Sequence, residues 1–167
     1  MTLDKSRLQE NFAAVQARWN EHTETDPGLV CKQGSYKNCH VVKLQKASWT
    51  NDDMGRLENE SGIFFSVWID AEDATRNRAQ YNIHALKLRQ LRGYAISSRD
   101  FASEFRASFA SMQSAWPNVS VAYGPQTLMQ GWIDIDERSC GASILSLMLR
   151  FAEVAPLIDR LLQQRRR

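Results

Sequence analysis

One short segment limits the folds open to this chain more than any other. Residues 63–69 alternate, and both resulting faces are apolar: Ile63, Phe65, Val67 and Ile69 lie on one face, and Phe64 and Trp68 lie on the other. A period of two is typical of a β-strand, because successive side chains point to opposite faces of a sheet. A strand that is apolar on both faces is usually covered on both sides or meets a partner on one of them. We therefore expect a sheet with a central strand at this position.

Three other segments repeat apolar residues every three or four positions, which is the spacing of one helix face. They are residues 4–22 with Leu8, Phe12, Val15 and Trp19, the run Phe101, Phe105, Phe109, Met112 and Trp116, and the run Ile144, Met148, Phe151, Ala155, Ile158 and Leu162. Asp4 is a candidate N-cap of the first helix, and Ser97 and Ser98 are candidates for the second. Pro156 interrupts the last stripe and either kinks that helix or divides it in two.

The remaining strands are predicted from shorter alternating runs. They fall at residues 39–49, from Tyr81 onward with a bulge or bend where Leu86 and Leu88 change the phase, at 94–96, and in a hairpin formed by 119–123 and 128–135. Leu88 and Leu91 also fit a helical turn that ends at Gly93. Residues 23–38, 50–61 and 70–79 are expected to be loops or connections. Since no strand–helix–strand alternation runs through the chain, the sequence indicates an α+β fold. We expect a single antiparallel sheet of five or six strands with an N-terminal, a middle and a C-terminal helix, in the order α-β-β-β-(β)-α-β-β-α.

Composition indicates one globular domain over residues 1–167. A chain of 167 residues suits one domain, and its 43% hydrophobic and 24% charged residues are close to globular averages. The net charge of +2 is too balanced to require a polyanionic partner. Three of the basic residues end the chain, and we expect residues 163–167 to be a frayed basic tail.

Cysteine usage and the N-terminus favour a cytoplasmic protein. Cys31, Cys39 and Cys140 are odd in number and widely spaced, so they do not form a disulfide framework. No basic stretch followed by an apolar run opens the chain, as a secretory signal would. The near-apolar run at 62–69 is far shorter than a membrane helix. We expect free thiols and no membrane association.

The sequence contains no motif that specifies a reaction. Glycine-rich phosphate-binding loops and serine or cysteine nucleophile motifs are absent. Cys39 and His40 are adjacent, so in a strand they point to opposite faces and do not form a metal site together. Asp134 and Asp136 share a face and could hold Mg²⁺, but a polar strand end before a helix is the commoner meaning. No metal or cofactor is expected, and enzyme activity stays open.

Our first functional hypothesis is a non-catalytic binding or interaction module that acts as a homodimer. Strands that are apolar on both faces suggest an interface, and tryptophan often anchors interfaces. Trp68 and Trp132 are the candidate interface residues. Another protein is also a possible partner.

Two alternatives remain open. The first is an enzyme or small-ligand-binding protein with a pocket near His40, His84 and Arg89, to which Lys87 would contribute. These residue types can hold a small anion or move a proton. The second is a nucleic-acid binder that uses Lys87, Arg89 and Arg92 together with the arginine tail, because cationic side chains near aromatic rings bind single strands.

Overall fold

The computed structural model describes residues 3–22, 26–54, 56–58 and 60–167. Its strands form one five-stranded sheet and are β1 (Val30–Tyr36), β2 (Cys39–Gln45), β3 (Gly62–Ile69), β4 (Arg78–Leu86) and β5 (Thr127–Asp134). The α-helices are α1 (Lys5–Glu21), α2 (Ala71–Arg76), α3 (Ser98–Phe109) and α4 (Cys140–Gln163), and the 3₁₀ helices are η1 (Ala47–Trp49), η2 (Leu88–Gln90) and η3 (Gln113–Ala115). The expected class is confirmed: one antiparallel sheet with an N-terminal, a middle and a C-terminal helix.

The sheet is a meander in which every strand pairs antiparallel with the next one along the chain. Its membership differs from the sequence-based prediction at three places. The expected loop at 23–38 contains β1, an edge strand whose centre, Lys32 to Gly34, shows no apolar alternation. The segments 94–96 and 119–123, predicted as strands, contribute only the isolated bridges Tyr94–Arg166 and Ser120–Gln130.

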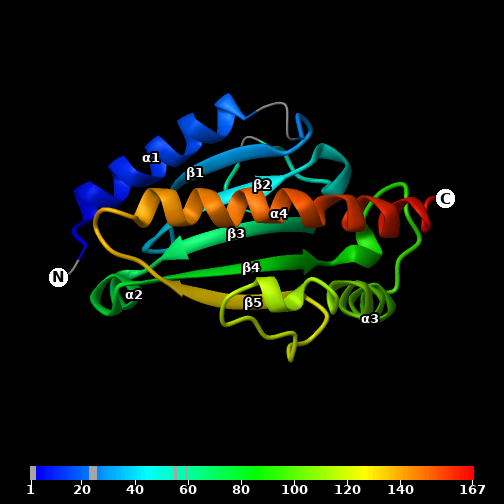
Figure 1. The fold of residues 1–167 in the computed structure, drawn as a ribbon. Coiled ribbons are helices and arrows are strands. Elements are labelled where there is room, and N and C mark those ends of the chain that lie inside the picture. The colour runs from blue at the N-terminus through cyan, green and yellow to red at the C-terminus, as the bar shows by residue number, and fades with distance from the viewer. Residues whose placement is uncertain (1–2, 23–25, 55, 59) are drawn as a thin grey trace.

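Helices lie over one face of the sheet. Figure 1 shows α1 and α4 side by side across that face, with α3 at one end and the short α2 at the other. The opposite face carries no helix in the described part of the chain, and we call it the open face. The fold therefore has two layers, a sheet and a layer of helices, and the described helices leave the second face of the sheet uncovered.

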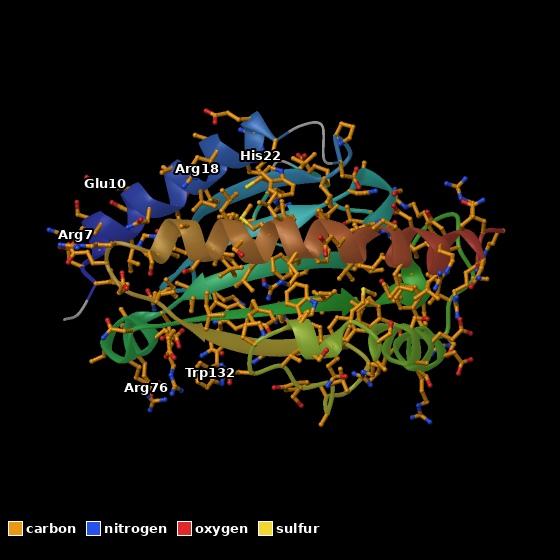
Figure 2. The ribbon with its side chains drawn as sticks, viewed as in Figure 1. Arg7, Glu10, Arg18, His22, Arg76 and Trp132 are labelled. Atoms are coloured by element: carbon orange, nitrogen blue, oxygen red, sulfur yellow. The ribbon has the colours of Figure 1, made fainter. Side chains whose placement is uncertain are left out.

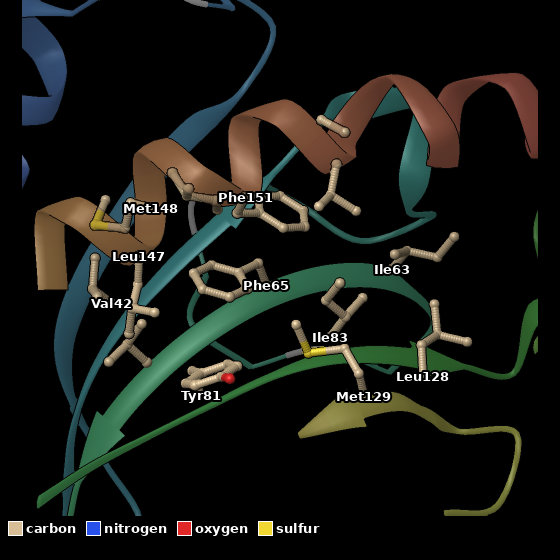
Figure 3. Packing of buried hydrophobic residues seen from close by; sticks show 14 of the residues in the cluster. Val42, Ile63, Phe65, Tyr81, Ile83, Leu128, Met129, Leu147, Met148 and Phe151 are labelled. Atoms are coloured by element: carbon tan, nitrogen blue, oxygen red, sulfur yellow. The ribbon is translucent and has the colours of Figure 1, made fainter. Parts of the chain in front are cut away.

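The core between the two layers centres on aromatic rings. Phe65 of β3 stacks on Phe151 of α4 with ring centroids 4.6 Å apart and planes within 10° of parallel (Figure 3). Trp49 meets the same Phe151 ring edge-on at 5.9 Å, and Trp116 packs against Phe65 at 6.0 Å. Offset aromatic pairs of this kind stabilise a core beyond the area that they bury. They hold α4 on the centre of the sheet.

A polar clamp fixes the second half of α4. The carboxylate of Asp159 accepts hydrogen bonds from Lys46 Nζ at 2.6 Å and from Trp49 Nε1 at 2.8 Å. Lys46 also pairs with Asp26 at 2.9 Å. The Trp49 side chain is fully buried, so this bond satisfies its indole N–H where water cannot reach it.

Two helices differ from their predicted extents for local reasons. α2 occupies the segment expected to be a connection and carries too short an apolar pattern to be recognised. It is closed by a capping box, in which Asp70 accepts the N–H of Asp73 and the Asp73 carboxylate accepts the N–H of Asp70. α3 ends at Phe109, whereas the apolar stripe predicts a helix to Trp116. A turn and η3 follow α3, and they still place the Trp116 side chain in the core.

α4 is one continuous helix with Pro156 inside it, so the proline does not divide it. This helix is long and apolar enough to cross a membrane, with a mean hydropathy of 1.5 over its most apolar window. Of that window, 56% is buried inside the molecule, as in a core helix.

The prediction of a frayed C-terminal tail is wrong. The Ala95 N–H donates to the carbonyl of Arg165 at 2.8 Å, and the Arg167 N–H donates to the carbonyl of Gly93 at 3.1 Å. Arg165 also pairs with Glu104 of α3 at 2.9 Å. The tail is fixed because the segment 93–95, which finds no partner strand in the sheet, offers its backbone groups to it.

Candidate functional site

Three rows of side chains cross the open face, since strand register places residues of neighbouring strands side by side. The middle row is polar and consists of Lys32, Lys43, Ser66, Asn82 and Gln130. The rows on either side of it contain the aromatic residues Phe64, Trp68 and Trp132 and the imidazole of His84. A sheet face that meets only water is usually polar throughout. The open face departs from this expectation, because aromatic rows flank its polar row.

A hydrogen-bond network joins the middle of the polar row. Ser66 Oγ donates to Asn82 Oδ1 at 2.8 Å, and Asn82 Nδ2 donates to Gln130 Oε1 at 3.4 Å. The same amide nitrogen lies 2.8 Å from His84 Nε2. Ser66 and Asn82 are 4% and 1% exposed, so their polar groups need these partners. The network makes a rigid polar floor between aromatic walls.

The network determines the protonation state of His84. An amide nitrogen can only donate, so Asn82 requires Nε2 of His84 to be the bare, accepting nitrogen. Nδ1 then carries the proton and faces the carbonyl of Gln126 at 3.4 Å. Burial lowers the pKa of His84, and the Gln126 carbonyl opposes this effect in part. His84 is therefore a neutral hydrogen-bonding group at pH 7, and its ring lies beside that of Phe64, with centroids 5.1 Å apart and planes tilted by 46°.

Lys43 anchors a loop over one end of the polar row. Its Nζ donates to the backbone carbonyls of Arg56 at 2.7 Å and Leu57 at 3.4 Å. Burial lowers the pKa of Lys43 to about 8, with Asp52 opposing and Lys32 adding to the effect. The anchor brings Leu57 down onto the open face, where it contributes an apolar wall.

Together these side chains surround a hollow of about 440 Å³, which we call the open-face hollow. Ser66, Asn82 and Gln130 line its floor, and Phe64 and Trp68 line its sides, together with Leu57 and the turn between β1 and β2. Among the described residues, the lining includes Lys37 and Lys43 and no carboxylate. Its size and its few polar groups among apolar ones are typical of small-molecule sites.

Trp132 lies on the open face but outside the hollow. It sits on the edge strand β5, in the same row as Trp68 (Figure 2). The guanidinium of Arg78 stacks on its ring, 3.8 Å from the centroid. The two candidate interface tryptophans thus share one face, and only Trp68 contributes to the hollow.

The four predicted ligand-binding residues do not come together. His84 lines the open-face hollow, whereas His40 lies on the helix-covered face and lines a different pocket. Arg89 lines a third hollow with Arg99 and Arg167, and Lys87 caps η2 in a left-handed conformation with φ of 48°. One pocket near His40, His84 and Arg89 is therefore not formed, because β2 and β4 present their histidines to opposite faces.

The metal hypotheses gain no geometric support. Within the described residues, no three His, Cys, Asp or Glu side chains lie close enough to hold a metal ion. Asp136 instead accepts the N–H groups of Arg138 and Ser139, both at 2.8 Å, in the turn before α4. The three cysteines are free thiols.

Sequence reasoning missed Asn82, Gln130 and Ser66 as a group. Each is the polar residue near the centre of an otherwise largely apolar strand, with an aromatic or imidazole ring two positions away. That repeated pattern in three strands is a signal that could have found them. Comparisons with protein-family models, with curated proteins and with solved structures give no match for this chain.

Proposed function

We propose that this protein is a non-catalytic binding module that takes a small organic ligand in the open-face hollow. The single observation that supports this most is the buried polar floor, Ser66–Asn82–Gln130, between aromatic walls on the face without helices. A planar apolar group would stack against Phe64 or Trp68, and a polar group on the ligand would bind Gln130.

The shape of the face favours an inserted ligand over a flat partner. Two sheets that pack face to face interdigitate their side chains and leave few voids. A hollow of about 440 Å³ on each copy would remain unfilled in such a pair. A molecule that enters the hollow avoids that loss of contacts.

The charge of the lining favours a neutral or anionic ligand. Lys37 and Lys43 contribute positive charge, and no Asp or Glu of the part of the chain that the structure describes lines the hollow. A cationic ligand would have no partner for its charge there, and burying an unpaired charge is costly.

Native mass spectrometry of the freshly purified protein tests the proposal. We expect a population with a small additional mass, and we expect Trp68→Ala to lose that population because it removes one wall. Trp132→Ala is the matched control, since it removes a tryptophan from the same face without touching the hollow. Retention of the ligand in Trp68→Ala, or its loss in Trp132→Ala alone, would contradict a site in the hollow.

Self-association over the same face is the second candidate, supported by the half-exposed pair Trp68 and Trp132. A homodimer that uses the whole face would depend on both tryptophans. The same spectra decide between the two functions: a dimer mass that both variants weaken equally supports self-association, and a strictly monomeric wild type rejects it.

A further inference from the structure

His40 is a buried polar side chain to which the described residues offer no hydrogen-bond partner. It is the second residue of β2, is 7% exposed, and packs beside Phe12 of α1 with ring centroids 5.9 Å apart. Neither ring nitrogen bonds any described residue, in contrast to His84 on the other face. Most buried polar groups have a partner, so an unpaired imidazole at this depth requires an explanation.

The explanation lies in a pocket of about 460 Å³ that His40 lines, which we call the His40 pocket. It opens where α1 and α2 leave the end of the sheet uncovered between them. Neither nitrogen of His40 is completely enclosed by protein atoms, so the ring is open toward this pocket. The pocket supplies space for a hydrogen-bond partner that the described residues do not provide.

The walls of the His40 pocket are largely apolar and its charged groups are mostly cationic. Leu8 and Ile69 are buried apolar walls, and Lys5 and Lys37 are exposed lysines on either side. Among the described residues of the lining, Asp70 is the one carboxylate, and it accepts the N–H of Asp73 as the cap of α2. A negative charge in the pocket would meet two ammonium groups and an imidazole that can donate, against this single carboxylate.

We infer that the His40 pocket binds a small organic anion, a carboxylate with a short apolar body. The anionic oxygens lie among His40, Lys5 and Lys37, and the apolar body packs against Leu8 and Ile69. An anion that accepts from the ring gives His40 the hydrogen bond that it lacks. Charge-assisted hydrogen bonds are roughly twice as strong as neutral ones, so a carboxylate is a better occupant than an alcohol.

This site is distinct from the open-face hollow. β2 directs His40 to the helix-covered face, while His84 lies on the open face. The two pockets share only Tyr36, Lys37 and Cys39, at the turn between β1 and β2. Each pocket has its own histidine, so each can be observed separately.

The test is a titration of the full chain with benzoate, followed by the NMR signals of the histidine rings. The chain has three histidines: His40 in its pocket, His84 in the open-face hollow and His22 at the exposed end of α1 (Figure 2). We expect a saturable shift of the His40 ring, and a rise in the His40 pKa because a nearby anion favours the imidazolium form. Benzyl alcohol, the neutral counterpart, should bind roughly tenfold more weakly.

Variants keep the test decisive. Lys5→Gln with Lys37→Gln changes only exposed side chains and should weaken benzoate binding by roughly tenfold, whereas Lys87→Gln, at the other end of β4, should not change it. No saturable shift of His40 at millimolar benzoate would overturn the inference, as would equal binding of benzyl alcohol. Benzoate that shifts only His84 would support the open-face hollow and reject the His40 pocket.

Discussion

Asn82 is the residue on which the polar floor of the open face depends, because it bonds Ser66, Gln130 and His84 at once. We expect Asn82→Ala to lower the free energy of unfolding by about 1–3 kcal/mol, since it leaves buried polar groups unpaired. The pKa of His84 should rise, because its neutral form loses a donor. Urea denaturation and NMR titration measure both effects. Asn20→Ala on the exposed side of α1 is the control, and equal behaviour of the two variants would contradict the network.

The two interior histidines predict a pH dependence of stability. Burial is the main cause that lowers the pKa of His40 and of His84, so the folded protein binds protons less readily than the unfolded chain. Lys5 adds to the effect at His40, where Lys37 and Asp70 are the other charged groups that face the pocket. Stability is then greatest above the unfolded value of about 6.5 and falls as the pH decreases through the folded values.

Denaturation at roughly pH 7.5 and pH 5.5 measures this loss, which amounts to about 1.4 kcal/mol for each unit by which a histidine pKa is lowered. His84→Gln should flatten the dependence, because it removes one of the two histidines whose pKa burial lowers. An identical pH profile for His84→Gln and wild type would show that His84 titrates normally.

Gly131 illustrates a constraint at a single position of β5. A Cβ atom there would overlap the Tyr81 ring, whose hydroxyl donates to the carbonyl of Pro117 at 2.7 Å. Because Tyr81 is fully buried, it has little space to move. We expect Gly131→Ala to destabilise the fold by about 1–3 kcal/mol, as overpacking does. Gly124→Ala, where a Cβ atom meets nothing within 4 Å, is the matched control in thermal denaturation.

At the scale of elements, the periodicity of apolar residues predicts long, half-buried helices and strands, and it misses short helices and strands at the edge of the sheet. α1, α4 and β3 follow from apolar spacing because each buries a continuous stripe. α2 is fixed by the Asp70 cap rather than by a stripe. β1 pairs on one side only, so its sequence carries little of the alternation that marks a strand.

The candidate site was predictable only in part for a related reason. Alternation within a strand places Trp68 and Phe64 on one face, which the sequence shows. It does not show which residues of β2 share a face with which residues of β4, because that depends on how each strand pairs with β3 between them. His40 and His84 were therefore grouped, although the register separates them.

Pro156 gives a prediction for α4. It is exposed, and its ring nitrogen cannot donate to the carbonyl one turn earlier. We expect Pro156→Ala to raise the free energy of unfolding by about 1–3 kcal/mol, because it restores that hydrogen bond and removes a clash. Glu153→Ala, on the same exposed side, is the control for a surface change. Equal or lower stability of Pro156→Ala in urea denaturation would contradict this expectation.

At the scale of the whole molecule, the fixed tail gathers positive charge at one end. Arg89, Arg99 and Arg167 line one hollow, and Lys87 and Arg92 lie before and after η2, the short helix that contains Arg89. None of these five side chains forms an ion pair with a described residue. Although the net charge is near neutral, the basic side chains are unevenly distributed over the molecule. The nucleic-acid hypothesis depends on this uneven distribution.

Two variants with the same net charge test this distribution. The triple change Arg89→Gln, Arg92→Gln and Arg99→Gln removes clustered charge, whereas Arg18→Gln, Arg56→Gln and Arg138→Gln removes dispersed charge. We expect the first variant to elute from a cation exchanger at lower salt than the second, because clustered charges act together on one surface. Elution at the same salt concentration would show that the cluster has no collective effect, and would weaken the case for nucleic-acid binding.

The two helices that cover the sheet come from opposite ends of the chain. β5 ends at Asp134 and α4 begins only at Cys140, so a ribosome that has delivered all five strands still retains the helix that covers their centre. Protein synthesis adds ~5–20 residues per second, so the aromatic face around Phe65 stays without α4 for a few seconds. During that interval the apolar core face of the nascent sheet lacks its central helix, and we expect it to be a target for chaperones. The speed at which the last helix is translated then becomes a determinant of how much protein reaches the native state.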